Sequence, residues 1–191
     1  MGAVGQLVYT AITSLDGFIH DADGGFEWAA PSAEVHRYVN DLERDIGTHL
    51  YGRRMYESLV AWETLPTEHE PDYIRDFATI WRRAHKVVYS STLDSVSSEN
   101  TELERSFDAG AVQALTAASD HDVAIGGAQL AAVALAAGLV DVLHQFVTPV
   151  VVGGGQPWLA ADVRLDLELR DEHRFADGVV HLAYGVVDRR T

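Results

Sequence analysis

Short apolar runs rich in β-branched residues alternate with longer runs of helical spacing along almost the whole chain. Strands are expected at residues 4–14, 48–51, 86–90, 123–125 and 142–152, and helices at 32–46, 53–59, 72–84, 109–118 and 127–137. Two last strand-like runs, 164–174 and 179–187, flank Asp177-Gly178, which is a hairpin signal. This alternation predicts an α/β fold with a mixed, mainly parallel sheet and a C-terminal antiparallel hairpin.

Length and charge narrow the class of protein further. The 191 residues favour one domain, 1–191, and the net charge of −15 disfavours nucleic acid and anionic lipid as partners. Residues 123–140 carry no charge, but their glycines and alanines predict a buried strand, turn and helix rather than a membrane span. With no basic leader at the N-terminus, the cytoplasm is the expected location.

Three expected strand ends carry groups that can bind an anion. They are Tyr51-Gly-Arg-Arg-Met55, the hydroxyl run Ser90-Ser-Thr92, and Ile125-Gly-Gly-Ala128. In α/β sheets, ligands bind where strands end and helices begin, because free backbone N–H groups and the helix dipole favour negative charge there.

Each of these segments also has an ordinary structural explanation, such as a solvated basic helix start, a strand stop or tight helix packing. Neither G-x-G-x-x-G nor a P-loop motif is present. The three segments together nevertheless favour one nucleotide with several phosphates over three unrelated features.

The order of several motifs resembles a known family. The motifs are S-L-D-G (14–17), G-R-R-M-Y-E (52–57), K-V-V-Y-S-S-T-L (86–93), I-G-G-A-Q-L (125–130) and G-L-V-D-V-L…P-V-V-V-G-G-G (138–155). Together they resemble the dihydrofolate-reductase-like family that includes the reductase domain of bacterial riboflavin biosynthesis. The resemblance covers almost the whole chain and implies a sheet of about eight strands flanked by helices.

The same resemblance implies an NADPH-dependent reductase, commonly a homodimer. It assigns cofactor binding to Thr10, Ala11, Gly17, Gly52, Arg53, Arg54, Met55, Ser90, Ser91, Thr92, Ile125, Gly126, Gly127, Ala128, Gln129 and Leu130. The first three would lie beside the nicotinamide, and the others would hold the 2′-phosphate and the pyrophosphate. In dihydrofolate reductases the Gly-Gly peptide bond is cis, so the resemblance implies the same at Gly126-Gly127.

The substrate stays open between two classes. The chain lacks the aspartate–proline segment that riboflavin reductases carry after the second strand, and Glu34 lies out of register with the carboxylate that holds a pterin in dihydrofolate reductases. A pteridine- or pyrimidine-like heterocycle is therefore expected, as in dihydrofolate reductase or 5-amino-6-(5-phosphoribosylamino)uracil reductase. The alternative is a non-catalytic nucleotide-binding or sensing module on the same fold.

The acidic segment 13–28 could be a calcium loop, an ordinary acidic turn or a mobile lid. An EF-hand register that fits Asp21, Asp23 and Gly24 puts Ile19 first and Ala30 last, so the calcium interpretation fails at both ends. Glycines and small polar residues between strand and helix favour a lid that excludes water.

Asp16 and Glu34 are the candidate proton donors or substrate anchors, and Trp28 is a candidate for stacking on a flat substrate. A turn aspartate, a helix-start acid and a packed tryptophan are the structural alternatives. The nine histidines have no metal-binding spacing and there are no cysteines, so no metal site is expected.

Overall fold

The computed structural model describes residues 4–188 and has two compact units, each assembled from separate stretches of the chain. Residues 4–6 and His36–Gly127 form the first unit, and Leu7–Val35 and residues 128–188 form the second. The main sheet has eight strands in all, and most neighbouring pairs are parallel. The fold class is therefore confirmed, while a single domain 1–191 stays a prediction.

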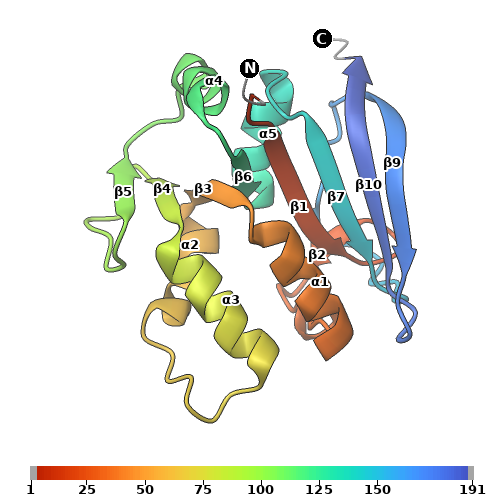
Figure 1. The fold of residues 1–191 in the computed structure, drawn as a ribbon. Helices are drawn as coiled ribbons and strands as arrows, with labels where there is room; N and C mark the ends of the chain where they lie inside the picture. Colours follow the sequence, from red (N-terminus) through yellow and green to blue (C-terminus); the bar gives the residue numbers. More distant parts are fainter. Residues whose placement is uncertain (1–3, 189–191) are drawn as a thin grey trace. The chain divides into compact units, whose positions relative to one another are not determined.

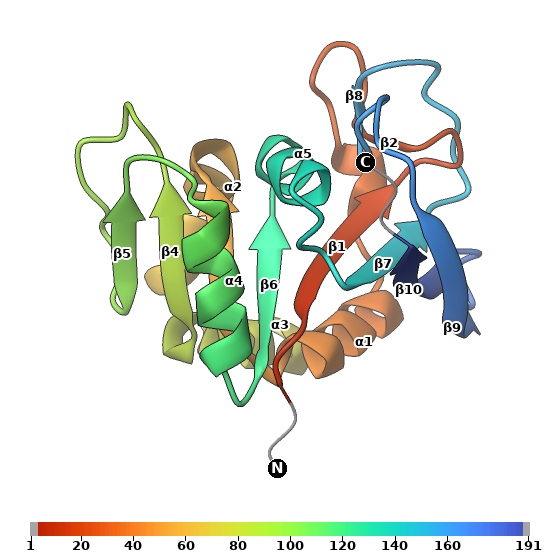
Figure 2. The same cartoon turned by 90° about the horizontal axis from the view of Figure 1, so that it is seen from above.

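The first unit contains four parallel strands in the order β5-β4-β3-β6. Their bounds are β3 Ile46–Gly52, β4 His85–Tyr89, β5 Thr101–Glu104 and β6 Asp122–Gly126. Helices α2 (Arg53–Leu59) and α3 (Asp72–Arg83) lie on one side of these strands and α4 (Ala109–Ala118) on the other, as Figures 1 and 2 show; the 3-10 turn η2 is Val60–Glu63. A core of large apolar side chains, including Leu50, Trp81, Val88 and Ile125, fills the unit.

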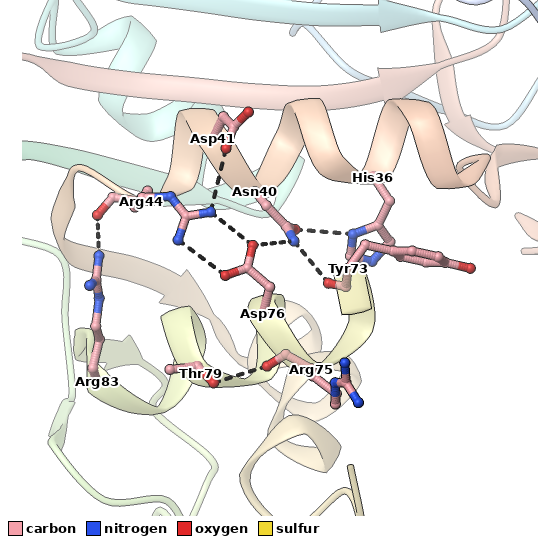
Figure 3. Close-up of polar contacts among 9 residues, drawn as sticks. All are labelled: His36, Asn40, Asp41, Arg44, Tyr73, Arg75, Asp76, Thr79 and Arg83. Atoms are coloured by element: carbon pink, nitrogen blue, oxygen red, sulfur yellow. Dashed lines mark hydrogen bonds and ion pairs between the residues drawn. The ribbon is translucent and has the colours of Figure 1, made fainter. Parts of the chain in front are cut away.

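Helix α1 (Ala33–Glu43) and helix α3 are joined by a polar network (Figure 3). The buried amide of Asn40 donates to the Tyr73 carbonyl at 2.8 Å and to the Asp76 carboxylate at 2.9 Å. Arg44 donates to both oxygens of Asp76, at 3.1 and 2.8 Å. These bonds fix α3 against α1 through charge-assisted contacts rather than through apolar packing alone.

Ionisable side chains are buried beneath α3 in the same unit. His49 and Lys86 occupy paired positions on β3 and β4, and they are 4% and 0% exposed. The Lys86 ammonium donates to the Trp81 and Ala84 carbonyls at 3.0 and 2.8 Å and lies over the Trp81 ring. His49 Nδ1 lies 3.6 Å from a carboxylate oxygen of Glu43, whose side chain is only 16% exposed.

Burial shifts the pKa values of Glu43 and His49 in opposite directions. It raises the pKa of Glu43 to about 7. Burial, with a smaller contribution from the charge of Lys86, lowers the pKa of His49 to about 3. His49 is therefore neutral at physiological pH, and Glu43 titrates near neutrality.

The second unit contains strands in the order β1-β7-β10-β9, which run side by side in Figure 1. Their bounds are β1 Leu7–Thr13, β7 Val142–Val147, β9 Asp166–Arg174 and β10 Val180–Asp188; η1 is Glu27–Ala29 and α5 is Ala128–Ala136. β1 and β7 are parallel, whereas β10 is antiparallel to β7 and to β9, which confirms the C-terminal hairpin. Tyr9 and Trp158 stack, and the Tyr9 hydroxyl donates to the Trp158 carbonyl at 2.9 Å.

Most expected elements are confirmed, with three corrections. The first helix ends at Glu43 and Ile46 begins β3, although Ile46 fits the helical spacing. The long strand expected at 142–152 stops at Val147, because Val150 N–H turns back to the Thr148 carbonyl. The segment 93–107 is polar and weakly patterned, so no strand or helix is expected there, but it contains β5.

Candidate functional site

The ends of β3, β4 and β6 bring three of the sequence-predicted segments together. Gly52 pairs with Tyr89, directly before Ser90, and Tyr51 pairs with Gly126. We call Gly52–Met55, Ser90–Thr92 and Gly126–Gly127 the strand-end cluster. Because the three strands are parallel neighbours, their C-terminal ends meet at one edge of the first unit.

A side-chain bond connects two of these segments. Arg53 Nη1 donates to the Thr92 hydroxyl at 2.9 Å, and Arg53 Nε donates to Glu57 at 2.8 Å. Arg54 is exposed, and its guanidinium has no hydrogen-bond or ion-pair partner within residues 4–188. The cluster thus carries two exposed arginines at a strand end, which is a donor set suited to phosphate oxygens.

The serine run divides into one structural and two exposed residues. The buried Ser90 hydroxyl accepts the N–H groups of Thr92 and Leu93 at 3.2 and 2.9 Å, and so shapes the turn after β4. Ser91 and Thr92 are exposed. Below them a buried group of Tyr51, Tyr56 and Val88 gives the cluster a packed base.

The two glycines lie where the chain's own side chains, Tyr51 and Met55, pack closely against the backbone. A Cβ on Gly126 would lie 3.0 Å from the Tyr51 ring and 3.3 Å from Met55 Cγ. Gly127 has φ +96°, a conformation that side chains other than glycine disfavour. The cis bond implied by the resemblance is absent: no cis peptide occurs within residues 4–188, so the Gly126-Gly127 bond is trans.

Gly127→Ala should lower the free energy of unfolding by about 1–2 kcal/mol, because an L-residue is strained at this φ. Urea unfolding measures the change. Gly154→Ala is the matched control, since a Cβ there would meet nothing within 4 Å. An equal loss in the two variants would contradict this explanation.

The start of α5 is largely buried. Ala128 and Leu130 are 8% and 9% exposed, and Ile125 before them is 2% exposed. Gln129 is the exposed side chain of this stretch. Only the backbone and Gln129 can therefore contact a ligand there.

In the second unit, Thr10 and Ala11 lie on β1 opposite His144 and Gln145 of β7. Gly17 has φ +87° and accepts the Trp158 N–H at 3.1 Å. Beyond it, β2 (Phe18–His20) pairs with β8 (Gln156–Pro157). The acidic segment is hydrogen-bonded at two places. Strand β2 pairs with β8, and farther along the chain the Asp21 carboxylate accepts the N–H groups of Asp23 and Gly25. Whether the segment moves as a lid stays a prediction.

Asp16 has backbone partners on a distant part of the chain. Its carboxylate accepts the N–H groups of Val152 and Gly153 at 3.2 and 2.8 Å. A hydrogen bond with the Ser14 side chain, with help from these N–H groups, holds the pKa of Asp16 below its usual value. Asp16 is thus ionised at neutral pH and joins two loops, which favours a structural role over proton donation.

Asp16→Ala should speed hydrogen exchange at the Val152 and Gly153 amides, because both lose their acceptor. Exchange followed by NMR or mass spectrometry measures this. Asp23→Ala, an exposed acid of the same segment, should leave the two amides unchanged. Unaltered exchange in Asp16→Ala would show that the carboxylate does not hold the loop.

Glu34 and Trp28 also have local partners. Glu34 Oε2 accepts the Ala176 N–H at 3.1 Å, in the turn between β9 and β10. Trp28 is half-buried, and its indole N–H donates to the Gly25 carbonyl at 3.3 Å. Their roles toward a substrate stay predictions.

One residue of this region has no counterpart among the sequence-predicted site residues. Arg105 follows β5 and donates to the Leu93 carbonyl at 2.5 Å, with longer contacts to the Ser90 and Asp94 carbonyls. It therefore holds the turn that carries Ser91 and Thr92. An arginine directly after a strand could have marked Arg105 as a site residue. The sequence did not predict β5, so this signal was missed.

The model of the family described as RibD C-terminal domain matches residues 6–181. The chain belongs to the RibD C-terminal domain family. The family match covers sequence from both units.

Three similar proteins illustrate the range of the RibD C-terminal domain fold. Uncharacterized protein YyaP of Bacillus subtilis (strain 168) is 27% identical over 186 residues, 94% of each chain. A protein of Shewanella sp. PV-4 provisionally named for riboflavin biosynthesis has a TM-score of 0.73 at 18% identity, covering 96% of this chain and 99% of that one. Dihydrofolate reductase from Enterococcus faecalis, complexed with NADP(H) and RAB-propyl, has a TM-score of 0.63 at 16% identity, covering 97% and 98%. At these identities the two structures establish the fold.

Two negative findings concern residues 4–188 of this RibD-type chain. No group of three or more His, Asp or Glu side chains is arranged to hold a metal ion. No helix in that range has the length and apolarity needed to cross a membrane.

Proposed function

We propose that the protein is an NADPH-dependent reductase that transfers hydride to a small pteridine- or pyrimidine-like heterocycle. The observation that carries the proposal is the strand-end cluster, where Arg53 bonds to Thr92 across the ends of β3 and β4. Membership of the RibD C-terminal domain family, together with the resemblance to the reductase domain of riboflavin biosynthesis, supports it.

The strand-end cluster fits the phosphates of a dinucleotide. Arg53, Arg54, Ser91 and Thr92 offer exposed donors for the 2′-phosphate and pyrophosphate. The backbone of Gly126-Gly127 is the proposed contact for the pyrophosphate, as the resemblance implies, and Gln129 offers a side chain at the start of α5. In this proposal, Thr10, Ala11 and Gly17 lie beside the nicotinamide, as the resemblance implies.

When bound, NADPH supplies the hydride; the chain orients the substrate, excludes water and provides a proton for the reduced heteroatom. Trp28 is the proposed stacking partner for the substrate, and the segment 13–28 the proposed cover. Asp16 and Glu34 are the proposed acids, and Glu34 Oε1, which has no hydrogen-bond partner among the described residues, is available to a substrate.

Calorimetric titration of the purified protein with NADPH, followed by NADPH oxidation with a panel of pterins and aminopyrimidines, tests the proposal. Binding at micromolar concentration and turnover of at least one panel member are expected. No affinity for NADPH at millimolar concentration would refute it.

A non-catalytic nucleotide-binding module is the second candidate. Both Asp16 and Glu34 accept hydrogen bonds from backbone N–H groups, which favours it, because such bonds are typical of acids that stabilise loops. Tight NADPH binding without oxidation across the whole panel would support this candidate over the reductase.

We also propose a homodimer, as the resemblance to the family implies. Sedimentation velocity distinguishes a dimer from a monomer. A cytoplasmic location stays a prediction from the sequence.

A further inference from the structure

Arg53 occupies a helix position that is unfavourable for a cation. It is the first residue of α2, where the helix dipole favours negative charge. Its guanidinium is held there by two side chains, Glu57 at 2.8 Å from Nε and Thr92 at 2.9 Å from Nη1. The positive charge of Arg53 is unfavourable next to the helix N-terminus, and the carboxylate of Glu57 compensates for it.

Glu57 also lowers the positive charge available at the strand-end cluster. The Arg53–Glu57 pair is about half exposed on both sides, at 50% and 45%, so an incoming phosphate meets the carboxylate as well as the guanidinium. The cluster has two arginines, and the carboxylate in contact with Arg53 offsets one of them. A phosphate group and Glu57 therefore compete for the same cation.

We propose that Glu57 limits the affinity of the strand-end cluster for a phosphate and thereby sets how strongly NADPH is favoured over NADH. This inference rests on the proposed binding of a dinucleotide at the cluster. The 2′-phosphate is the group that distinguishes the two dinucleotides, so the effect of Glu57 falls on NADPH. Thr92 keeps the guanidinium in place when the carboxylate charge is removed.

Glu57→Gln tests the proposal, because the amide oxygen can still accept from Arg53 Nε while the negative charge is lost. The dissociation constants of NADPH and NADH are measured by calorimetry at low and high salt. At low salt the NADPH constant should fall roughly threefold, the size expected for one exposed charge. The NADH constant should stay unchanged, and the NADPH effect should fade at about 1 M salt.

Asp72→Asn is the matched control. It removes the same charge from another exposed arginine pair, Arg37–Asp72, which belongs to no part of the strand-end cluster. NADPH affinity should not change in this variant. Unchanged or weaker NADPH binding in Glu57→Gln, or an equal gain for both dinucleotides, would overturn the inference while leaving dinucleotide binding intact. If neither dinucleotide binds any of the three proteins, the proposed function fails as well.

Discussion

Arg53→Ala should weaken NADPH binding by about 10- to 150-fold and change NADH binding little. The variant loses a charge-assisted hydrogen bond to the 2′-phosphate, and such a bond contributes roughly 1.5–3 kcal/mol. It also loses the contact with Thr92 that joins α2 to the turn after β4. Calorimetric dissociation constants for both dinucleotides measure the effect, and Arg54→Ala should act in the same direction.

Arg83→Ala is the control for loss of an arginine. Arg83 is also exposed and donates to the Arg44 carbonyl, but it lies at the end of α3 and outside the strand-end cluster. It should leave both dissociation constants unchanged. Equal losses of NADPH and NADH affinity in Arg53→Ala would mean that the arginine does not bind the 2′-phosphate.

Glu43→Gln should raise the free energy of unfolding at pH 8 by about 2–3 kcal/mol and change it little near pH 4.5. The folded-state pKa of Glu43 is raised to about 7. Its favourable contribution is therefore complete below the unfolded value and is lost as the pH rises through 7. Glutamine keeps the shape of the neutral side chain and never ionises, so the variant escapes that loss. Urea unfolding from pH 4.5 to 8 measures the difference.

His49 controls the acid side of the same profile. Because its folded-state pKa is lowered to about 3, its contribution is present above pH 6.5 and is lost as the pH falls toward 3. The parent protein and Glu43→Gln both contain His49. Their free energies of unfolding should therefore fall in parallel as the pH is lowered below 4.5. A stability difference between Glu43→Gln and the parent that stays constant from pH 4.5 to 8 would contradict a raised pKa at Glu43.

The elements with strong local patterns could be predicted from sequence. Helix α4 matches its expected range, residues 109–118, and Asp108 caps it by accepting the Ala111 N–H at 2.8 Å. Strand β5 could not be predicted, because Thr-Glu-Leu-Glu is short and acidic, and two of its four residues are exposed. Its formation depends on parallel pairing with β4, which a local pattern does not encode.

In the candidate site too, local features could be predicted from the sequence and long-range contacts could not. The glycines and arginines at the strand ends stand out in the sequence, because each follows an apolar run directly. The contact of Arg53 with Thr92 joins residues 39 positions apart, and that of Asp16 with Gly153 joins residues 137 positions apart. Such contacts depend on strand order, so the sequence does not reveal that Asp16 has two backbone partners. Its role toward a substrate stays a prediction.

The four tryptophans give each unit its own optical reporter. Trp62 and Trp81 belong to the first unit, and Trp28 and Trp158 to the second. Trp81 is fully buried over the Lys86 ammonium, while Trp158 stacks on Tyr9 and lies near Gly17. Intrinsic fluorescence, with one tryptophan pair replaced by phenylalanine at a time, can therefore reveal whether the two halves melt together or in sequence.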